Sequence, residues 1–169
     1  KGICIYTVTP AQVISEATSQ EAMRIAEAIA TLTEVVGVMA VEMFVKGDQL
    51  FINELAMRPH NSGHWSINGS QTSQFEQHLR AVLNMPLGPT DLTSEYTVMG
   101  NVLGGNRVSP LTDTEVIAAR SPRMSFHDYK KAVRPGRKIG HVTECGSDLL
   151  QLTQDVRFAR DWMSGVIDG

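Results

Sequence analysis

Residues 53–65 gather many chemically capable side chains into one short polar segment. Within thirteen residues there are a carboxylate, an arginine, two histidines, two amides and a serine. Carboxylate and amide oxygens bind hard divalent cations, whereas arginine binds phosphate and carboxylate oxygens. A second isolated carboxylate, Glu42, lies just upstream. We therefore interpret this part of the chain as a site for a metal ion and an anion.

Glu42 and Glu54 are the only charged residues in two apolar segments, residues 37–45 and 50–57. Their composition predicts two strands joined by a turn at residues 46–49, which makes a hairpin. Because both strands are apolar on both faces, we expect both to be covered. A bare carboxylate there would be costly, and a bound cation would remove that cost.

The register of the hairpin decides whether the two glutamates can share a cation. If Lys46 pairs with Leu50 across a three-residue turn, Glu42 lies opposite Glu54 with Cβ atoms ~5 Å apart. A two-residue turn would place them on opposite faces. The paired arrangement predicts Mg²⁺ or Mn²⁺, because few protein oxygens leave positions for water and phosphate. The alternative is that both glutamates lie at solvated strand ends or in salt bridges.

His60 and His64 have the i, i+4 spacing that would suggest zinc on a helix. Pro59 and the Asn-Ser-Gly sequence of residues 61–63 disfavour a helix at this point. We therefore prefer an anion site over a zinc site.

A tight turn is predicted at residues 134–137. Four basic residues lie in or next to this turn: Lys131, Arg134, Arg137 and Lys138. Clusters of this kind are commonly solvated faces. The Pro-Gly turn could instead present two or three of the cations to one phosphate monoester.

The elements that must position these residues indicate an α+β protein. Ser73 stands at the start of one predicted amphipathic helix, and Ser147 and Asp148 are the predicted caps of another. Strands are predicted at residues 97–103, 124–129 and 138–143, and a short helix at residues 112–120. Glycine and proline between residues 104 and 110 predict a boundary. We therefore expect a larger unit at residues 1–104 and a smaller one at residues 105–169.

Composition limits the possible partners and compartments. A net charge of −3 argues against a general nucleic-acid binder. No apolar run approaches the ~20 residues that cross a bilayer, so we expect no membrane association. Cys4 and Cys145 form no CxxC pair and are expected to be reduced. Because Lys1 opens a strand-like segment without an initiator Met, we expect a fragment, a processed chain or the ordered part of a longer protein.

The motifs together resemble the ATP-grasp carboxylate–amine ligases, and within them the carboxyaminoimidazole ribonucleotide synthetases. The resemblance runs in the family's order over most of the chain, and it is carried by Glu42 and residues 53–54, 58–65, 73–80, 101–104 and 129–141. Residues 58–65 are the most specific of these matches.

The resemblance implies a fold and a reaction. Residues 1–104 would be the C-terminal part of an ATP-grasp domain, mainly antiparallel sheet with helices, and a small α+β domain would follow. ATP would phosphorylate bicarbonate to carboxyphosphate. The amine of aminoimidazole ribonucleotide would then capture the carboxyl group or the CO₂ released from it, in purine biosynthesis.

The resemblance also implies residue roles. Glu42 and Glu54 would bind Mg²⁺, with Asn53 beside them at the ATP site. Arg58 and His60 would serve catalysis, Arg58 by neutralising phosphoryl or carboxyphosphate oxygens. Substrate binding would fall to Asn61, Ser62, Lys131, Arg137 and Lys138. The 5′-phosphate of the ribonucleotide would lie at the three basic residues, in the same cleft as Arg58 and His60.

Two residues depart from the family pattern. Met57 stands where Pro is usual, and Lys130 stands where Gly or Asp is common. The family's phosphate-binding lysines, Gly-rich loop and adenine hinge do not occur in these 169 residues. We therefore expect the 169 residues alone to be inactive. We expect the intact enzyme to be a cytoplasmic homodimer with a functional link to the mutase of the same pathway.

Two other classes remain open. One is a different ATP-grasp ligase, such as the formyl-transferring glycinamide ribonucleotide enzyme or a biotin-carboxylase-like enzyme. The former shares Arg-Pro-His but is not expected to continue as residues 61–65 do. The other is an inactive fragment that serves as an interaction module.

Overall fold

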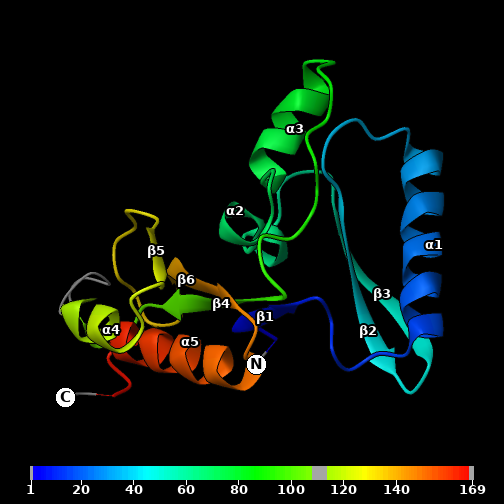
Figure 1. The fold of residues 1–169 in the computed structure, drawn as a ribbon. Helices are drawn as coiled ribbons and strands as arrows, with labels where there is room; N and C mark the ends of the chain where they lie inside the picture. The colour runs from blue at the N-terminus through cyan, green and yellow to red at the C-terminus, as the bar shows by residue number, and fades with distance from the viewer. Residues whose placement is uncertain (1, 108–113, 168–169) are drawn as a thin grey trace. The chain divides into compact units, whose positions relative to one another are not determined.

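The computed structural model describes residues 2–107 and 114–167, which form two compact units (Figure 1). The hairpin unit comprises Ala11–Asp91, and the sheet unit comprises Lys1–Pro10 with Leu92–Gly169. Helices and antiparallel sheets in both units confirm the predicted α+β class. Among the described residues no helix is long and apolar enough to cross a membrane.

The hairpin unit combines a long helix, a two-stranded sheet and a region of short helices. Its elements are α1 (Glu16–Thr33), β2 (Ala40–Lys46), β3 (Gln49–Ala56), the 3₁₀ turn η1 (Asn61–Gly63), α2 (Ser66–Gly69) and α3 (Gln74–Val82). α1 runs alongside the hairpin in Figure 1. Ser73 caps α3 as predicted, because its side chain accepts a hydrogen bond from the backbone N–H of Glu76.

The apolar side chains of the hairpin are more exposed than predicted. Phe44 is 62% exposed, Phe51 49% and Ile52 53%. The expectation that both strands are covered is therefore wrong for this chain. α1 contacts the hairpin through β3, and a single helix cannot cover both faces of a sheet.

The sheet unit is a four-stranded antiparallel sheet with helices packed on one face (Figure 1). Its strands have the order β1-β4-β6-β5, and its elements are β1 (Tyr6–Thr9), β4 (Tyr96–Leu103), α4 (Thr114–Arg120), β5 (Ser125–Asp128), β6 (Lys138–Gly146) and α5 (Leu149–Ser164). Of the two predicted caps, Asp148 and not Ser147 is the N-cap of α5, and its side chain accepts from the N–H of Gln151. The first two residues of the helix predicted at 112–120 lie outside the described residues.

The hydrophobic core of the sheet unit lies between the sheet and α5. Val98 and Val102 of β4 and Val142 of β6 are fully buried, and they pack with Val156 and Ala159 of α5. These apolar residues alternate along the strands, so one face of the sheet meets the helix. This packing holds the loops at the ends of β4, β5 and β6 in place.

The structure divides the chain differently from the predicted boundary at residue 104. β4 was expected to belong to the first unit, but it lies in the sheet of the second, between β1 and β6. β1 joins the same sheet, although it lies about ninety residues upstream of β4 in the sequence. Pairing between distant strands has no local sequence signal, which is why the glycine-rich segment after β4 was interpreted as the boundary.

Candidate active site

The hairpin turn is shorter than predicted, yet the two glutamates still face each other. Lys46 pairs with Gln49, so the turn has two residues rather than three. This register alone would place Glu42 and Glu54 on opposite faces. A shift in register next to Glu42 leaves one extra residue, Asn53, in β3, and Glu42 pairs directly with Glu54. The predicted pairing is confirmed, and the predicted turn length is wrong.

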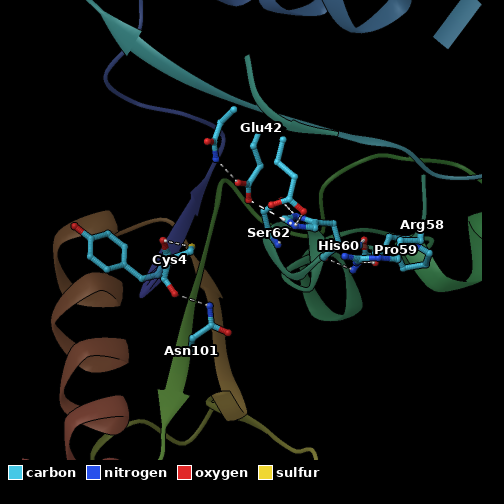
Figure 2. Close-up of polar contacts among 11 residues, drawn as sticks. Cys4, Glu42, Arg58, Pro59, His60, Ser62 and Asn101 are labelled. Atoms are coloured by element: carbon cyan, nitrogen blue, oxygen red, sulfur yellow. Dashed lines mark hydrogen bonds and ion pairs between the residues drawn. The ribbon is translucent and has the colours of Figure 1, made fainter. Parts of the chain in front are cut away.

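Both carboxylates approach one imidazole nitrogen. His60 Nε2 lies 3.6 Å from Oε1 of Glu42 and 4.0 Å from Oε1 of Glu54. Figure 2 shows the Glu42 side chain directed towards His60. Asn53 donates from Nδ2 to Oε2 of Glu42 at 3.2 Å, so the bulged residue orients the carboxylate beside it. The side chains of Glu42 and Glu54 are 32% and 51% exposed, which leaves them accessible to a dissolved ligand.

The loop after β3 determines which nitrogen of His60 carries a proton. His60 is the N-cap of η1, and its Nδ1 accepts a hydrogen bond from the backbone N–H of Ser62 at 3.3 Å. A backbone N–H can only donate, so Nδ1 must carry the lone pair. The hydroxyl of Ser62 lies 2.9 Å from the same nitrogen. The neutral imidazole therefore has its proton on Nε2, and this N–H points towards the carboxylates.

Gln74 holds the loop that carries His60. Its Oε1 accepts from the backbone N–H of His60 at 2.9 Å, and its Nε2 donates to the backbone carbonyl of His60 at 2.9 Å. The same Nε2 donates to Nδ1 of His64 at 2.8 Å. Ser66 Oγ accepts from the N–H of Gln74 and donates to the carbonyl of Gly63. Gln74 thus connects the start of α3 to both histidines of the motif.

Sequence reasoning missed the role of Gln74. The residue was interpreted only as the start of a helix, where a side chain is usually solvated, but it is 8% exposed. The available signal was a glutamine directly after the Ser73 cap, close in sequence to the Asn-Ser-Gly-His loop. Only the fold of residues 60–74 brings its amide against that loop.

The remaining predicted residues of the loop have different local partners. Arg58 donates from Nη1 to the carbonyl of Pro59 at 3.0 Å and is exposed (Figure 2). Asn61 opens η1, and Ser62 supports the His60 ring. The structure therefore brings together Glu42, Glu54 and His60 with their supporting residues. Arg58 is not part of this group, because its guanidinium contacts the carbonyl of the neighbouring residue, Pro59.

Glu42 and Glu54 fit a hard cation that takes few protein ligands. Among the described residues no group of three or more His, Cys, Asp and Glu side chains could hold a metal ion. The Glu42 and Glu54 carboxylates nevertheless lie close enough to repel each other, and a divalent ion between them would remove this repulsion. Mg²⁺ would take water and phosphate oxygens as its other ligands. His60 would orient the carboxylates and not bind the ion, because its Nε2 carries the proton.

A groove of about 430 Å³ opens beside His60 within the hairpin unit. Backbone and apolar groups of residues 38–41 form one wall. The remaining lining is rich in hydroxyl and amide side chains, which are Ser62, Ser66, Ser70, Thr72, Gln74, Gln77 and Thr90. Such a lining suits a polar ligand, because it offers hydrogen bonds without adding net charge.

The predicted basic turn is held against the end of β4 in the sheet unit. The N–H of Gly104 donates to the carbonyl of Arg137 at 2.7 Å, and the N–H of Gly136 donates to the carbonyl of Gly104 at 2.9 Å. A Cβ atom at residue 104 would collide with the backbone of Arg134, so glycine permits this approach. Arg137 donates from Nη1 to the carbonyl of Ala132, the residue after Lys131. This hydrogen bond holds the Arg137 guanidinium against that part of the loop.

Two family models match the chain. The ATP-grasp domain matches residues 1–75, and the phosphoribosylaminoimidazole carboxylase C-terminal domain matches residues 97–155. The N5-carboxyaminoimidazole ribonucleotide synthase of Mycobacterium bovis is 47% identical over 167 residues, which cover 96% of this chain and 39% of that relative.

Solved structures of such synthases have the same fold. The N5-carboxyaminoimidazole ribonucleotide synthetase of Thermus thermophilus aligns with a TM-score of 0.82 and 36% identity, over 99% of this chain and 44% of that one. The Aspergillus clavatus synthase, in complex with ADP and 5-aminoimidazole ribonucleotide, aligns with a TM-score of 0.84 and 32% identity, over 96% of this chain and 44% of that one.

The chain belongs to the ATP-grasp family that contains these synthases. It spans less than half the length of each of the three relatives. The family resemblance predicted from residues 42–65 and 129–141 is therefore confirmed.

One departure from the family pattern has a structural explanation. Lys130 has a φ of 55°, the left-handed region that glycine adopts without steric cost. Asp128 Oδ1 accepts from the N–H of Lys130 at 2.9 Å, and this hydrogen bond lowers the pKa of the Asp128 carboxyl. The Lys130 ammonium lies 3.0 Å from Oδ2 of the same carboxylate. Asp128 thus supports a lysine in a backbone conformation that favours glycine.

Proposed function

We propose that the intact protein is an ATP-dependent ligase that carboxylates 5-aminoimidazole ribonucleotide with bicarbonate. The observation that carries this proposal is the alignment of Glu42 with Glu54 beside the Nε2–H of His60, in a chain of this family. Paired carboxylates suit a divalent cation, and such a cation neutralises the phosphate oxygens of ATP while the phosphoryl group is transferred.

The reaction has two chemical steps. An oxygen of bicarbonate attacks the γ-phosphorus of ATP, the bond to the β-phosphate oxygen breaks, and ADP leaves with carboxyphosphate remaining. The ribonucleotide amine then attacks the carboxyl carbon, or the CO₂ released from it. Phosphate leaves, and the amine loses a proton as the C–N bond forms.

Glu42 and Glu54 would hold Mg²⁺, which supplies charge neutralisation for the phosphate oxygens when bound. Asn53 orients the Glu42 carboxylate from the bulge. Arg58 is exposed and sits four residues after Glu54 in sequence, so it can turn towards a carboxyphosphate oxygen when the anion is present. Ser62 would border the bound substrate in the polar groove, and Asn61 would contact the substrate from the start of η1.

The ribonucleotide 5′-phosphate would bind to Lys131, Arg137 and Lys138. The contacts of Gly104 and Ala132 hold this loop in a defined shape, which is what phosphate recognition by several cations requires. The resemblance also supports a cytoplasmic homodimer whose product passes to the mutase of the same pathway. Sedimentation of the purified intact protein tests the dimer.

The decisive experiment measures phosphate release by the intact protein with ATP and Mg²⁺. We expect release to require both 5-aminoimidazole ribonucleotide and bicarbonate, and ¹⁴C-bicarbonate to enter the ribonucleotide. Glycinamide ribonucleotide with formate, and biotin with bicarbonate, are the comparison reactions. Release that depends on either of those pairs would identify a different ligase. No release with any pair would favour an interaction module.

A further inference from the structure

Tyr129 and His141 join the basic loop to the interior of the sheet unit. The hydroxyl of Tyr129 lies 2.8 Å from Nδ1 of His141, a hydrogen-bond distance. His141 is 1% exposed and stands in β6, next to β4 and β5. The N–H of Tyr129 donates to the carbonyl of Ile139 at 3.0 Å, so the tyrosine is held through its backbone and its side chain.

The His141 ring is held by a second imidazole. His127 pairs with His141 across β5 and β6, and the rings stack with centroids 4.2 Å apart and planes 14° apart. The rings of Tyr129 and His141 have centroids 5.6 Å apart at 56°. Because the His141 side chain is packed on a strand between the rings of His127 and Tyr129, it has little rotamer freedom. Its hydrogen bond to the Tyr129 hydroxyl therefore defines the position of the tyrosine ring.

The chain bends at Lys130, so that the Lys131 side chain lies beside the ring of Tyr129. The left-handed conformation of Lys130, supported by Asp128, bends the loop at this point. The ammonium of Lys131 then lies 5.1 Å from the centroid of the Tyr129 ring, within the range of a cation–π interaction. Lys131 is exposed, so its ammonium is restrained and still accessible to an anion.

We propose that Tyr129, anchored by His141, is a positioning residue that fixes the Lys131 ammonium for a phosphate monoester. The proposal rests on the proposed role of Lys131 at the ribonucleotide phosphate. A lysine side chain has several rotatable bonds, and an aromatic platform reduces the number of conformations that phosphate binding must select from. Tyr129 therefore acts through Lys131 and does not touch the reacting atoms.

A double-mutant cycle in the intact enzyme tests this coupling. Tyr129→Phe keeps the ring but removes its bond to His141, and it should raise the KM for the ribonucleotide about threefold to tenfold, the effect of one ordinary hydrogen bond. The KM for ATP should not change. Lys131→Ala should raise the ribonucleotide KM further, and adding Tyr129→Phe to it should have no additional effect. Tyr6→Phe, on the edge strand of the same sheet, is the matched control and should leave both constants unchanged.

A second measurement does not depend on activity. After reductive ¹³C-methylation, the Lys131 methyl resonance, assigned by its loss in Lys131→Ala, should be displaced by the ring current of Tyr129. Tyr129→Leu should remove the displacement. An unchanged ribonucleotide KM in Lys131→Ala would contradict the proposed phosphate site, whereas an unchanged resonance would contradict the platform alone. A multiplicative effect of the two substitutions on KM would also overturn the proposal, because Tyr129 would then act independently of Lys131.

Discussion

Glu42 lies directly opposite Glu54 in a hairpin whose two-residue turn would by itself separate them. The extra residue Asn53 in β3 restores the alignment, and its side chain donates to the Glu42 carboxylate. The carboxylate pair thus depends on an irregularity in the strand and not on the turn. Bulges near functional sites commonly direct a side chain in this way.

Glu54→Gln in the intact enzyme should lower turnover by about 10²–10³ while the protein remains folded. The substitution removes one of the two charges proposed to hold Mg²⁺ and keeps the side-chain size. Steady-state phosphate release and the circular dichroism spectrum provide the two measurements. Glu27→Gln, on exposed α1, is the control and should have normal activity. Near-normal turnover of Glu54→Gln would contradict the ligand assignment.

In its neutral form, His60 should carry its proton on Nε2 in the free intact protein. The backbone N–H of Ser62 occupies Nδ1 as a donor, and this excludes the other neutral tautomer. Nitrogen-15 NMR of histidine-labelled protein, with His60→Asn to assign the signal, measures the tautomer. A protonated Nδ1 with a free Nε2 would contradict the local geometry, and it would make His60 a candidate metal ligand.

Gln74→Ala should lower turnover about tenfold to a hundredfold, as expected when a partner that orients active-site residues is removed. It should also lower the free energy of unfolding by about 1–3 kcal/mol, because buried groups of His60 lose their partners. Gln20→Ala is the control, since the Gln20 amide donates to Glu16 on α1 and Gln20 is not among the residues that line the groove. Equal losses of turnover in the two variants would argue against a specific role for Gln74.

Arg137→Ala should raise the KM for the ribonucleotide by roughly 10- to 100-fold, the effect expected for a hydrogen bond to a charged group. The KM for ATP should change little, because the lost contact is to the non-reacting phosphate. Arg24→Ala, on exposed α1, serves as the control for the loss of a surface cation. A variant altered only in its dependence on ATP would contradict the phosphate assignment.

The free energy of unfolding of the Glu144→Gln variant should depend less on pH than that of the unmodified protein. Burial raises the pKa of the Glu144 carboxyl, whose side chain accepts from the hydroxyl of Ser121 on the helical face of the sheet. The folded state therefore holds this proton more tightly than the unfolded state. That contribution to stability is full below the unfolded pKa of about 4.5 and is lost as pH rises through the folded value.

The stability of Glu144→Gln relative to the unmodified protein should accordingly increase as pH rises above about 4.5. Urea unfolding of both proteins from mildly acidic to mildly alkaline pH measures this difference. Glu115→Gln, on the exposed side of α4, is the control and should follow the unmodified protein throughout. A stability difference that falls with increasing pH would contradict the raised pKa.

Residue types and their spacing were enough to predict the family, the α+β class and several of the local elements. The Ser73 and Asp148 caps act through hydrogen bonds within three residues, so local pattern sufficed to predict them. The isolation of Glu42 and Glu54 in apolar segments suggested that they pair, and the register of the hairpin confirms this pairing.

Three further features depend on contacts between residues that local sequence preferences do not encode. β1 and β4 share a sheet through pairing between residues far apart in sequence, which no local preference encodes. The bulge at Asn53 changes the register that the two-residue turn sets, and the Asn53 side chain then donates to Glu42 on the opposite strand. Gln74 supports His60 only because η1 and α2 fold the intervening chain back on itself, so its role comes from that fold and not from its residue type.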